Sequence, residues 1–127
     1  MSGVYLLKVM TELSAAHALR GYPGDCARIH GHNWKLEAEI KTRTLDEIGI
    51  GVDFKEVKKA MREIADIIEH QYINEIPPFD KINPTAENIS AWFYQNLAPQ
   101  INDQNRKLIS VTLWETDRAS VRYMEDD

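Results

Sequence analysis

Alternation of apolar and polar residues dominates the first third of the chain. Residues 4–17 place Tyr5, Leu7, Val9 and Leu13 at positions of the same parity. Residues 32–41 alternate more cleanly, and one face carries His32, Trp34, Leu36, Ala38 and Ile40. A period of two is typical of antiparallel strands with one buried and one solvated face. We therefore predict two strands, separated by a loop that includes the turn-rich segment GYPGD at 21–25.

The period then changes to that of a helix. Residues 53–70 place on one helical face the apolar residues Phe54, Val57, Met61, Ile64, Ala65 and Ile68. Asp53 is the expected N-cap, and Glu56 three residues later completes a capping-box pattern. Residues 74–84 contain two consecutive prolines and are predicted to be loop. Thr85 is then expected to cap a second helix whose buried stripe comprises Ile89, Trp92, Phe93 and Leu97.

The last part of the chain is predicted to be a hairpin, with strands at 107–116 and 119–124 around Asp117 and Arg118. The resulting ββααββ order predicts an α+β fold with two helices on one face of a four-stranded antiparallel sheet. The chain has 127 residues and 43% hydrophobic content, so we expect one domain over residues 1–127 with a substantial core.

Composition narrows the expected partners. The net charge of −5 gives no general attraction for nucleic acid or anionic lipid. No apolar run approaches the roughly 20 residues that span a bilayer. The N-terminus lacks the pattern of a secretory leader, and a single cysteine makes no intramolecular disulfide. We therefore expect a cytoplasmic protein that binds neither nucleic acid nor membrane.

Three of the four histidines lie at strand ends. His30 and His32 are two residues apart, so on a strand their imidazoles point to the same face, with Cα atoms roughly 6.6 Å apart. His17 ends the first strand, and hairpin pairing would bring it to the same point. Each histidine alone has ordinary polar or packing roles. Together they predict a zinc site with three imidazoles and a fourth position for water or substrate.

Cys26 precedes this His-x-His pair by four residues, next to Asp25 and near Arg28. It has three interpretations: an inert small residue, a thiolate that acts as base or nucleophile beside a metal, or a fourth zinc ligand that closes a structural site. The spacing is compatible with all three.

Two acidic positions also have alternatives. Glu115 follows Ile109, Val111 and Leu113 at strand spacing, so it is either a solvated strand end or a carboxylate that accepts paired N–H donors from a ligand. Glu69 and His70 end the first predicted helix, where the histidine interacts with the helix terminus or forms a carboxylate–imidazole couple for proton transfer.

Six motifs carry a family resemblance that spans about residues 3–124: SAAH (14–17), C-x-x-x-H-G-H (26–32), GVDF (51–54), EHQYIN (69–74), NPTAEN (83–88) and WET (114–116). The chain resembles the 6-pyruvoyltetrahydropterin synthase superfamily. Within it, the three-residue gap between Cys26 and the HGH motif is most similar to the 6-carboxy-5,6,7,8-tetrahydropterin synthases of queuosine biosynthesis. Biopterin-forming relatives usually have a longer gap.

The resemblance implies the T-fold, whose subunits assemble into trimers or hexamers with active sites at subunit interfaces. It implies Zn²⁺ bound by three histidines, with a catalytic cysteine, an acidic residue paired with a histidine, and a glutamate that anchors the pterin. Carried over by motif, these are His17, His30 and His32 for zinc, Cys26, Glu69 and His70 for catalysis, and Glu115 for the substrate. The family usually has aspartate where this chain has Glu69, which makes the role of this carboxylate a question for the structure.

The implied activity is that of a zinc-dependent lyase. It converts 7,8-dihydroneopterin triphosphate to 6-carboxy-5,6,7,8-tetrahydropterin, acetaldehyde and triphosphate. The alternatives are a 6-pyruvoyltetrahydropterin synthase, which eliminates triphosphate without carbon–carbon cleavage, and a non-catalytic module that is stabilised by zinc. Arg20 and Arg28 are candidate triphosphate contacts, but we assign neither to the site.

Overall fold

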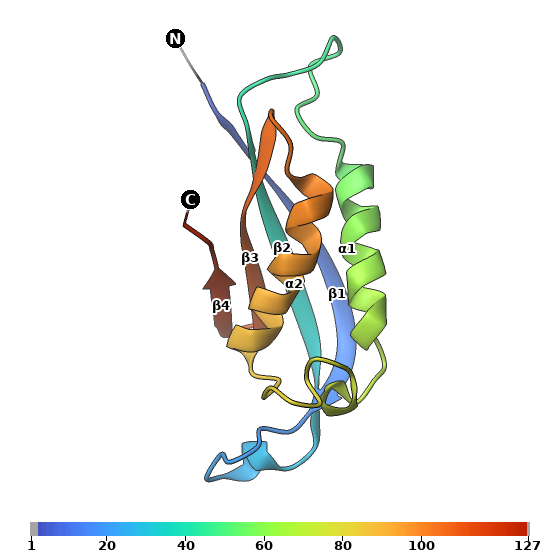
Figure 1. Cartoon of the computed structure of the whole chain (residues 1–127), viewed down its shortest axis with the longest axis vertical. Coiled ribbons are helices and arrows are strands. Elements are labelled where there is room, and N and C mark those ends of the chain that lie inside the picture. Colours follow the sequence, from blue (N-terminus) through green and yellow to red (C-terminus); the bar gives the residue numbers. More distant parts are fainter. Residues whose placement is uncertain (1–2, 127) are drawn as a thin grey trace.

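The computed structural model describes residues 3–126 and shows the predicted ββααββ order in that part of the chain (Figure 1). The elements are β1 (Tyr5–His17), β2 (His30–Thr42), α1 (Phe54–Ile68), α2 (Ala86–Ile101), β3 (Arg106–Thr116) and β4 (Ala119–Tyr123), with 3₁₀ turns η1 (Asp25–Ala27) and η2 (Ile73–Glu75). The domain expected over residues 1–127 includes residues 1, 2 and 127, which lie outside the described residues.

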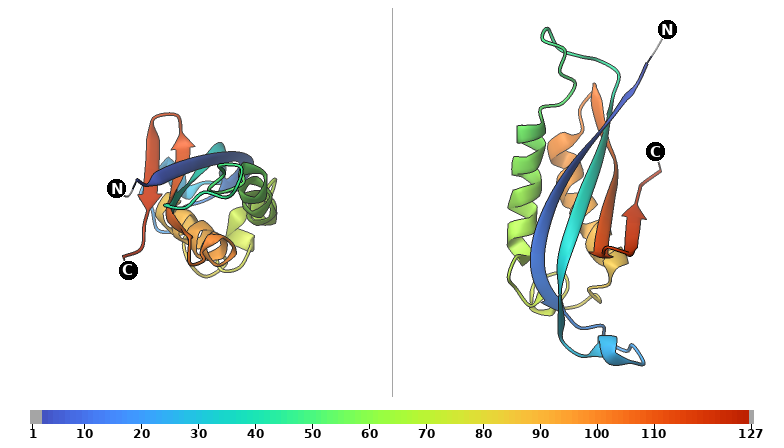
Figure 2. Two further views of the ribbon diagram at one scale, coloured as in Figure 1. Left: turned by 90° about the horizontal axis from the view of Figure 1, so that it is seen from above. Right: turned by 180° about the vertical axis from the view of Figure 1, so that it is seen from behind.

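The described strands form one antiparallel sheet in the order β1-β2-β3-β4. Both α-helices cover the same face of this sheet, as the views from above and from behind show (Figure 2). The predicted α+β class and the placement of the helices are therefore confirmed. No helix within residues 3–126 is long and apolar enough to cross a bilayer.

β1 and β2 form a long hairpin that pairs Tyr5 with Thr42 at one end and His17 with His30 at the other. The predicted alternation of β2 is confirmed, because Trp34 and the apolar residues that follow it at even positions are almost fully buried. Tyr5 is 49% exposed, in contrast to the face expected for it. Tyr5 is the first residue of β1, and the N-terminal end of this strand extends past the helices (Figure 1).

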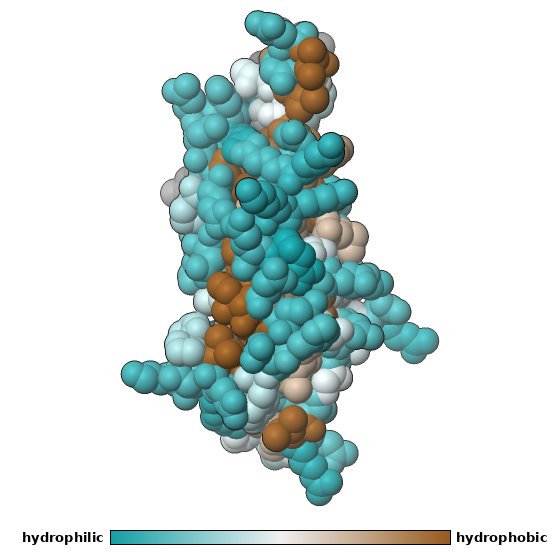
Figure 3. Space-filling model, turned by 90° about the vertical axis from the view of Figure 1, so that its right-hand side faces the viewer, coloured by the Kyte–Doolittle hydropathy of each residue, from teal (hydrophilic) through white to brown (hydrophobic). Residues whose placement is uncertain are grey.

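α1 packs its apolar stripe against the sheet and its outward side is mainly hydrophilic (Figure 3). Asp53 caps the helix, and its Oδ1 accepts a hydrogen bond from the Lys55 N–H at 2.9 Å. Phe54 was expected on the buried face but is 53% exposed. The buried arc starts one turn later, at Val57, and Ala60 completes it.

The capping-box role expected for Glu56 is wrong. Its carboxylate accepts two hydrogen bonds from Arg106, at 3.1 and 2.6 Å, in place of bonding to the helix N-terminus. Arg106 also donates from Nε to the Ile101 carbonyl at 2.7 Å. The guanidinium gives the carboxylate two charge-assisted hydrogen bonds, whereas a capping box would give it one. It joins the start of α1 to the α2–β3 connection, and the guanidinium lowers the pKa of Glu56.

We predict that Glu56→Gln lowers the free energy of unfolding at pH 7 by at most about 1 kcal/mol, because the pair is partly solvated. A carboxyl whose pKa is lower in the folded state stabilises the fold above its unfolded pKa and stops doing so as pH falls through the folded value. The difference between parent and variant should therefore shrink as the pH falls, measured by urea unfolding at pH 7 and at an acid pH below the folded pKa of Glu56. Glu63→Gln, at an exposed position of the same helix, is the control. An equal difference at both pH values would contradict the prediction.

α2 covers β3 and β4 and begins as predicted. The Thr85 hydroxyl accepts a hydrogen bond from the Asn88 N–H at 3.1 Å. Its buried positions are Ile89, Ser90, Phe93, Tyr94, Leu97 and Ile101. Trp92 is only partly buried and packs its ring against Phe79, with centroids 5.4 Å apart.

Two irregularities in β3 determine which way its side chains point. Glu39 pairs with Ser110 but Ile40 pairs with Leu108, so Ile109 is an extra residue in a bulge. Ile109 was expected to share the buried face with Val111 and Leu113. The extra residue reverses the alternation, and Leu108 is buried in its place.

The second irregularity lies between Trp114 and Thr116, where β4 pairs with both but not with Glu115. The β2–β3 ladder also ends at Trp114. Glu115 is therefore free of cross-strand pairing on both sides. It lies next to the end of the sheet that carries the histidines.

Candidate metal centre and active site

His17, His30 and His32 converge at the end of the β1–β2 hairpin, as predicted. His17 lies directly opposite His30, and one nitrogen of each imidazole lies within 4.8 Å of the others. The ring centroids are 4.5 Å apart for His17 and His30 and 4.9 Å apart for His30 and His32. This spacing suits three imidazoles that share one ion.

Backbone carbonyls orient two of these rings. His17 Nδ1 lies 2.7 Å from the Pro84 carbonyl oxygen, and His30 Nδ1 lies 2.8 Å from that of Arg28. Because a carbonyl only accepts, each Nδ1 must carry the proton, and each Nε2 presents a lone pair. Such second contacts are typical of metal-ligating histidines, since they fix the tautomer and the ring orientation.

Burial leaves two imidazole nitrogens of the cluster unpaired and favours the neutral form of both rings. The Nε2 atoms of His17 and His32 are buried without a hydrogen-bond partner among the described residues. Burial lowers the pKa of both imidazoles, which favours the neutral form that binds metal. Leaving a buried polar atom unpaired costs roughly 1–3 kcal/mol. The donor set therefore fits a metal ion, which would give these nitrogens a partner.

Trp34 forms one wall of the cluster. It is 1% exposed, and its ring lies edge-on to His17 and His32 with centroids 4.9 and 5.0 Å away. Its Nε1–H donates to the Ala15 carbonyl at 3.2 Å. This rigid indole limits the rotation of both imidazoles.

Glu115 lies beside the histidines. Its Oε1 is 3.3 Å from His32 Nε2, although the two groups are not aligned for a hydrogen bond. The carboxylate is partly exposed, so it can face both the cluster and a ligand. The structure thus places Glu115 where the sequence prediction needs it, while its role stays a prediction.

Cys26 lies in η1, on the loop that closes the same end of the molecule (Figure 1). It is half-buried, and its carbonyl accepts from the Leu19 N–H at 2.8 Å. The group of described residues that can hold a metal consists of the three histidines without Cys26. This arrangement favours a free thiol over a fourth ligand.

Two asparagines hold the chain that follows β1, and the sequence analysis missed this role. Asn74 bonds with its amide group to both the N–H and the carbonyl of Ala18, each at 2.9 Å. Asn83 does the same for Arg20, at 2.9 and 3.1 Å. Both belong to the quoted motifs EHQYIN and NPTAEN, which were the available signal. These amides fix the start of the loop that carries Cys26.

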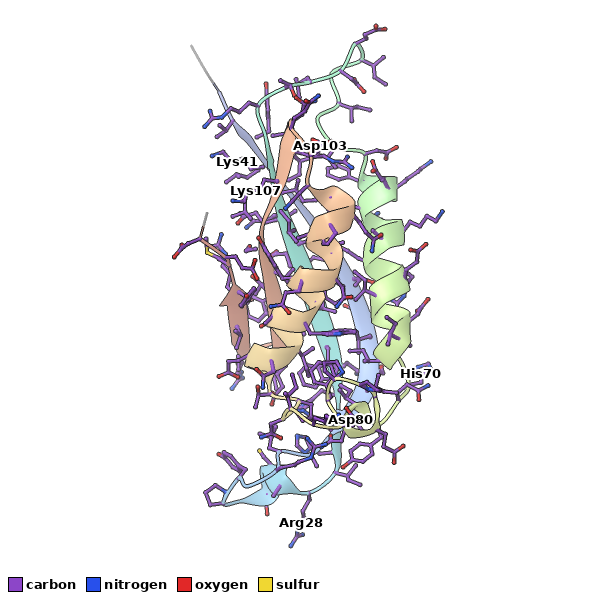
Figure 4. All side chains as sticks on the ribbon, in the orientation of Figure 1. Arg28, Lys41, His70, Asp80, Asp103 and Lys107 are labelled. Atoms are coloured by element: carbon purple, nitrogen blue, oxygen red, sulfur yellow. The ribbon has the colours of Figure 1, made fainter. Side chains whose placement is uncertain are left out.

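Arg20 is structural. Its guanidinium donates to the carbonyls of Asn74, Phe79 and Ile82 at 2.7–3.2 Å. Arg20 and Arg28 are both exposed, but the side chain of Arg28 points away from the molecule at the end that carries the cluster (Figure 4). Of the two arginines considered for the triphosphate, Arg20 has its guanidinium bonded to three backbone carbonyls, whereas the side chain of Arg28 extends into solvent.

His70 follows the C-terminus of α1 and lies at the same end of the molecule as Arg28 (Figure 4). Its side chain is 78% exposed. A pocket of about 520 Å³ is lined by His32 and His70, together with residues of β1, β2 and the segment after α1. The structure therefore brings His70 and one candidate metal ligand to the same pocket.

Glu69 and His70 do not form a hydrogen bond. Glu69 Oε2 and His70 Nε2 are 4.0 Å apart. Glu69 instead accepts from the Ser14 N–H at 2.6 Å and faces Arg62 at 3.4 Å. A proton-transfer couple of Glu69 and His70 stays a prediction that this geometry does not favour.

Comparisons with known proteins identify the family of the chain. The family profile described as 6-pyruvoyl tetrahydropterin synthase matches residues 6–126. The 6-pyruvoyl tetrahydrobiopterin synthase of Dictyostelium discoideum is 32% identical over 102 residues, which cover 79% of this chain and 73% of the relative. The 6-carboxy-5,6,7,8-tetrahydropterin synthase of Aquifex aeolicus is 27% identical over 124 residues, covering 80% and 76%.

Solved structures show the same fold. The structure of Caenorhabditis elegans 6-pyruvoyl tetrahydropterin synthase superposes with a TM-score of 0.87 and covers 98% of both chains at 22% identity. This identity is too low to carry function. It supports the T-fold that the sequence resemblance implied.

Proposed function

Because this chain belongs to the 6-pyruvoyl tetrahydropterin synthase family, we propose that it is a zinc-dependent lyase of queuosine precursor biosynthesis. Its substrate would be 7,8-dihydroneopterin triphosphate, and its products 6-carboxy-5,6,7,8-tetrahydropterin, acetaldehyde and triphosphate. The observation that carries the proposal is the convergence of three imidazoles beside a pocket that also contains His70. Relatives named for the carboxy-forming reaction support the choice of product.

His17, His30 and His32 would hold the zinc ion. When bound, zinc supplies a Lewis acid for the oxygen atoms of the substrate side chain. Because Cys26 is outside the ligand group of the described residues, a fourth coordination position would be available to a substrate oxygen.

Cys26 and His70 are proposed to move protons at the side-chain carbons of the substrate. The thiol lies on the loop after β1 and the imidazole lies on the pocket wall. General acid–base groups of this kind contribute roughly 10²–10⁴-fold to a rate. We further propose a homo-oligomer, trimeric or hexameric, with active sites completed between subunits. Pairing of the exposed edges of β1 and β4 would protect them from non-specific association.

Glu115 is proposed to anchor the pterin through two N–H donors of its amino-pyrimidine edge. Glu115→Gln keeps the shape but removes the charge and one acceptor, so we predict roughly tenfold to hundredfold weaker binding of 6-carboxypterin. Fluorescence titration of the zinc-loaded protein measures this. Asp117→Asn is the matched control, because Asp117 is 86% exposed and pairs with Lys35. Unchanged affinity in Glu115→Gln would exclude the anchoring role.

The proposed reaction is tested by incubating zinc-loaded protein with 7,8-dihydroneopterin triphosphate and identifying all products. Acetaldehyde with 6-carboxy-5,6,7,8-tetrahydropterin is the expected result. The Dictyostelium relative favours one alternative, formation of 6-pyruvoyltetrahydropterin without acetaldehyde. Absence of turnover with both zinc and substrate present would support the non-catalytic module.

A further inference from the structure

The segment after α1 adds to the free edge of β1. The His70 N–H donates to the Ser14 carbonyl at 2.7 Å, and the Ala16 N–H donates to the Gln71 carbonyl at 3.0 Å. Tyr72 forms a parallel bridge with Ala16. His70 itself has a φ of 58°, a left-handed conformation that a residue with a Cβ adopts only at a cost. The strand edge therefore holds His70 in a backbone conformation that it would not prefer alone.

The Glu69 side chain completes this attachment. Its Oε2 accepts from the Ser14 N–H at 2.6 Å, so residues 69 and 70 together bond both polar groups of the Ser14 backbone. A bond from an N–H to a carboxylate is about twice as strong as a neutral one. The carboxylate is thus directed to the strand, and its distance of 4.0 Å to His70 Nε2 follows from this direction.

Arg62 supports the carboxylate from the same helix. Its Nη2 lies 3.4 Å from Glu69 Oε1, and its Nη1 donates to the Glu12 carbonyl at 2.8 Å and to Thr11 Oγ1 at 3.1 Å. Its Nε donates to Asp66 Oδ1 at 2.8 Å. One guanidinium therefore ties the last turns of α1 to the β1 backbone just before Ser14.

We propose that Arg62 and Glu69 are positioning residues, which clamp Ser14 and thereby hold His70 on the wall of the pocket. In this arrangement Glu69 exchanges no proton with His70. The inference rests on the proposed function, in which His70 moves a proton, but the clamp itself has a readout that is independent of turnover.

A clamp and a proton couple predict opposite orders of activity for two conservative variants of Glu69, Glu69→Gln and Glu69→Asp. Glutamine keeps the length and an oxygen acceptor for the Ser14 N–H, but it holds no titrating proton. Aspartate keeps the charge but is shorter by one carbon–carbon bond, about 1.5 Å, so it withdraws from Ser14. A clamp tolerates glutamine and is damaged by aspartate, whereas a proton couple is damaged by glutamine and tolerates aspartate.

The first measurement is kcat and KM of the zinc-loaded full chain with dihydroneopterin triphosphate. We expect Glu69→Gln to stay within about threefold of the parent kcat, and Glu69→Asp and Glu69→Ala to lose roughly tenfold or more, with KM little changed. Arg62→Met should lose several-fold, and Lys58→Met, at an exposed position of the same helix, should match the parent. A loss of kcat in Glu69→Gln, together with the full parent kcat in Glu69→Asp, would overturn the proposal.

The second measurement is hydrogen exchange of the peptides that contain Ser14 and His70. Exchange should accelerate in Glu69→Ala, Glu69→Asp and Arg62→Met but not in Glu69→Gln or Lys58→Met. Unchanged protection in Glu69→Ala would overturn the clamp even if activity fell. If the parent turns over no pterin, the proposed function fails while this second measurement still decides the clamp.

Discussion

Replacing His30 with alanine is expected to remove most bound zinc and, with it, turnover. His30 supplies one of three nitrogens within 4.8 Å of one another, and its Nδ1 contact with the Arg28 carbonyl directs the other nitrogen inward. Loss of an outer contact to a ligand alone costs roughly 10–100-fold in metal affinity, so loss of the ligand should cost more. Metal analysis after dialysis should show well below one zinc per chain, and His32→Ala should behave likewise.

The remaining histidine provides the matched control. His70→Ala removes an imidazole from the same pocket but not from the ligand group, so it should keep close to one zinc per chain. Zinc should also raise the melting temperature of the parent and of His70→Ala but not of His30→Ala. A ligand that binds only the folded state adds about 4 kcal/mol at a thousandfold excess over its Kd. Full zinc occupancy in both His30→Ala and His32→Ala would exclude this ligand set.

The histidine cluster could be predicted because it depends on two local rules. A spacing of two residues places His30 and His32 on one face of a strand, and an antiparallel hairpin brings His17 opposite His30. The core positions of β2 and α1 follow from periodicity in the same way. The periodicity is clear in both elements because each buries one face in the same hydrophobic core.

Features that depend on a distant partner could not be predicted. The capping motif at Asp53 favoured a local bond for Glu56, but Arg106 arrives from 50 residues away and takes both oxygens. The bulge at Ile109 exists only in the pairing with β2, so the alternation of β3 alone placed this residue on the wrong face.

The residues that hold the site in place could not be predicted for the same reason, because their partners are distant in the sequence. Asn74 and Asn83 bond to chain segments 56 and 63 residues away, and nothing in their local sequence indicates those partners. Glu69 directly precedes His70 in the sequence and was expected to pair with it, but its carboxylate bonds to Ser14, 55 residues away. The sequence therefore indicated the candidate site residues better than the residues that position them.

Cys26→Ala is expected to keep close to one zinc per chain while losing roughly 10²-fold or more in kcat. The reason is that Cys26 lies on the closing loop but outside the ligand group, where a thiol can transfer protons without holding metal. Cys26→Ser should lose turnover as well, because a serine hydroxyl is a far weaker acid than a thiol. Zinc content and steady-state turnover of the same preparations test both parts.

Combining Cys26→Ala with His70→Ala separates a proton-transfer pair from two independent contributions. Groups that act as a unit are strongly non-additive, so the double variant should lose little more than the worse single variant. If each loss multiplied in full, Cys26 and His70 would serve separate steps, and the proposed pairing would be wrong. If Cys26→Ala instead lost its zinc and its folded stability, Cys26 would be a ligand. Combined with a parent that turns over no pterin, that result would identify the centre as structural, because a metal with four protein ligands leaves no position for a substrate.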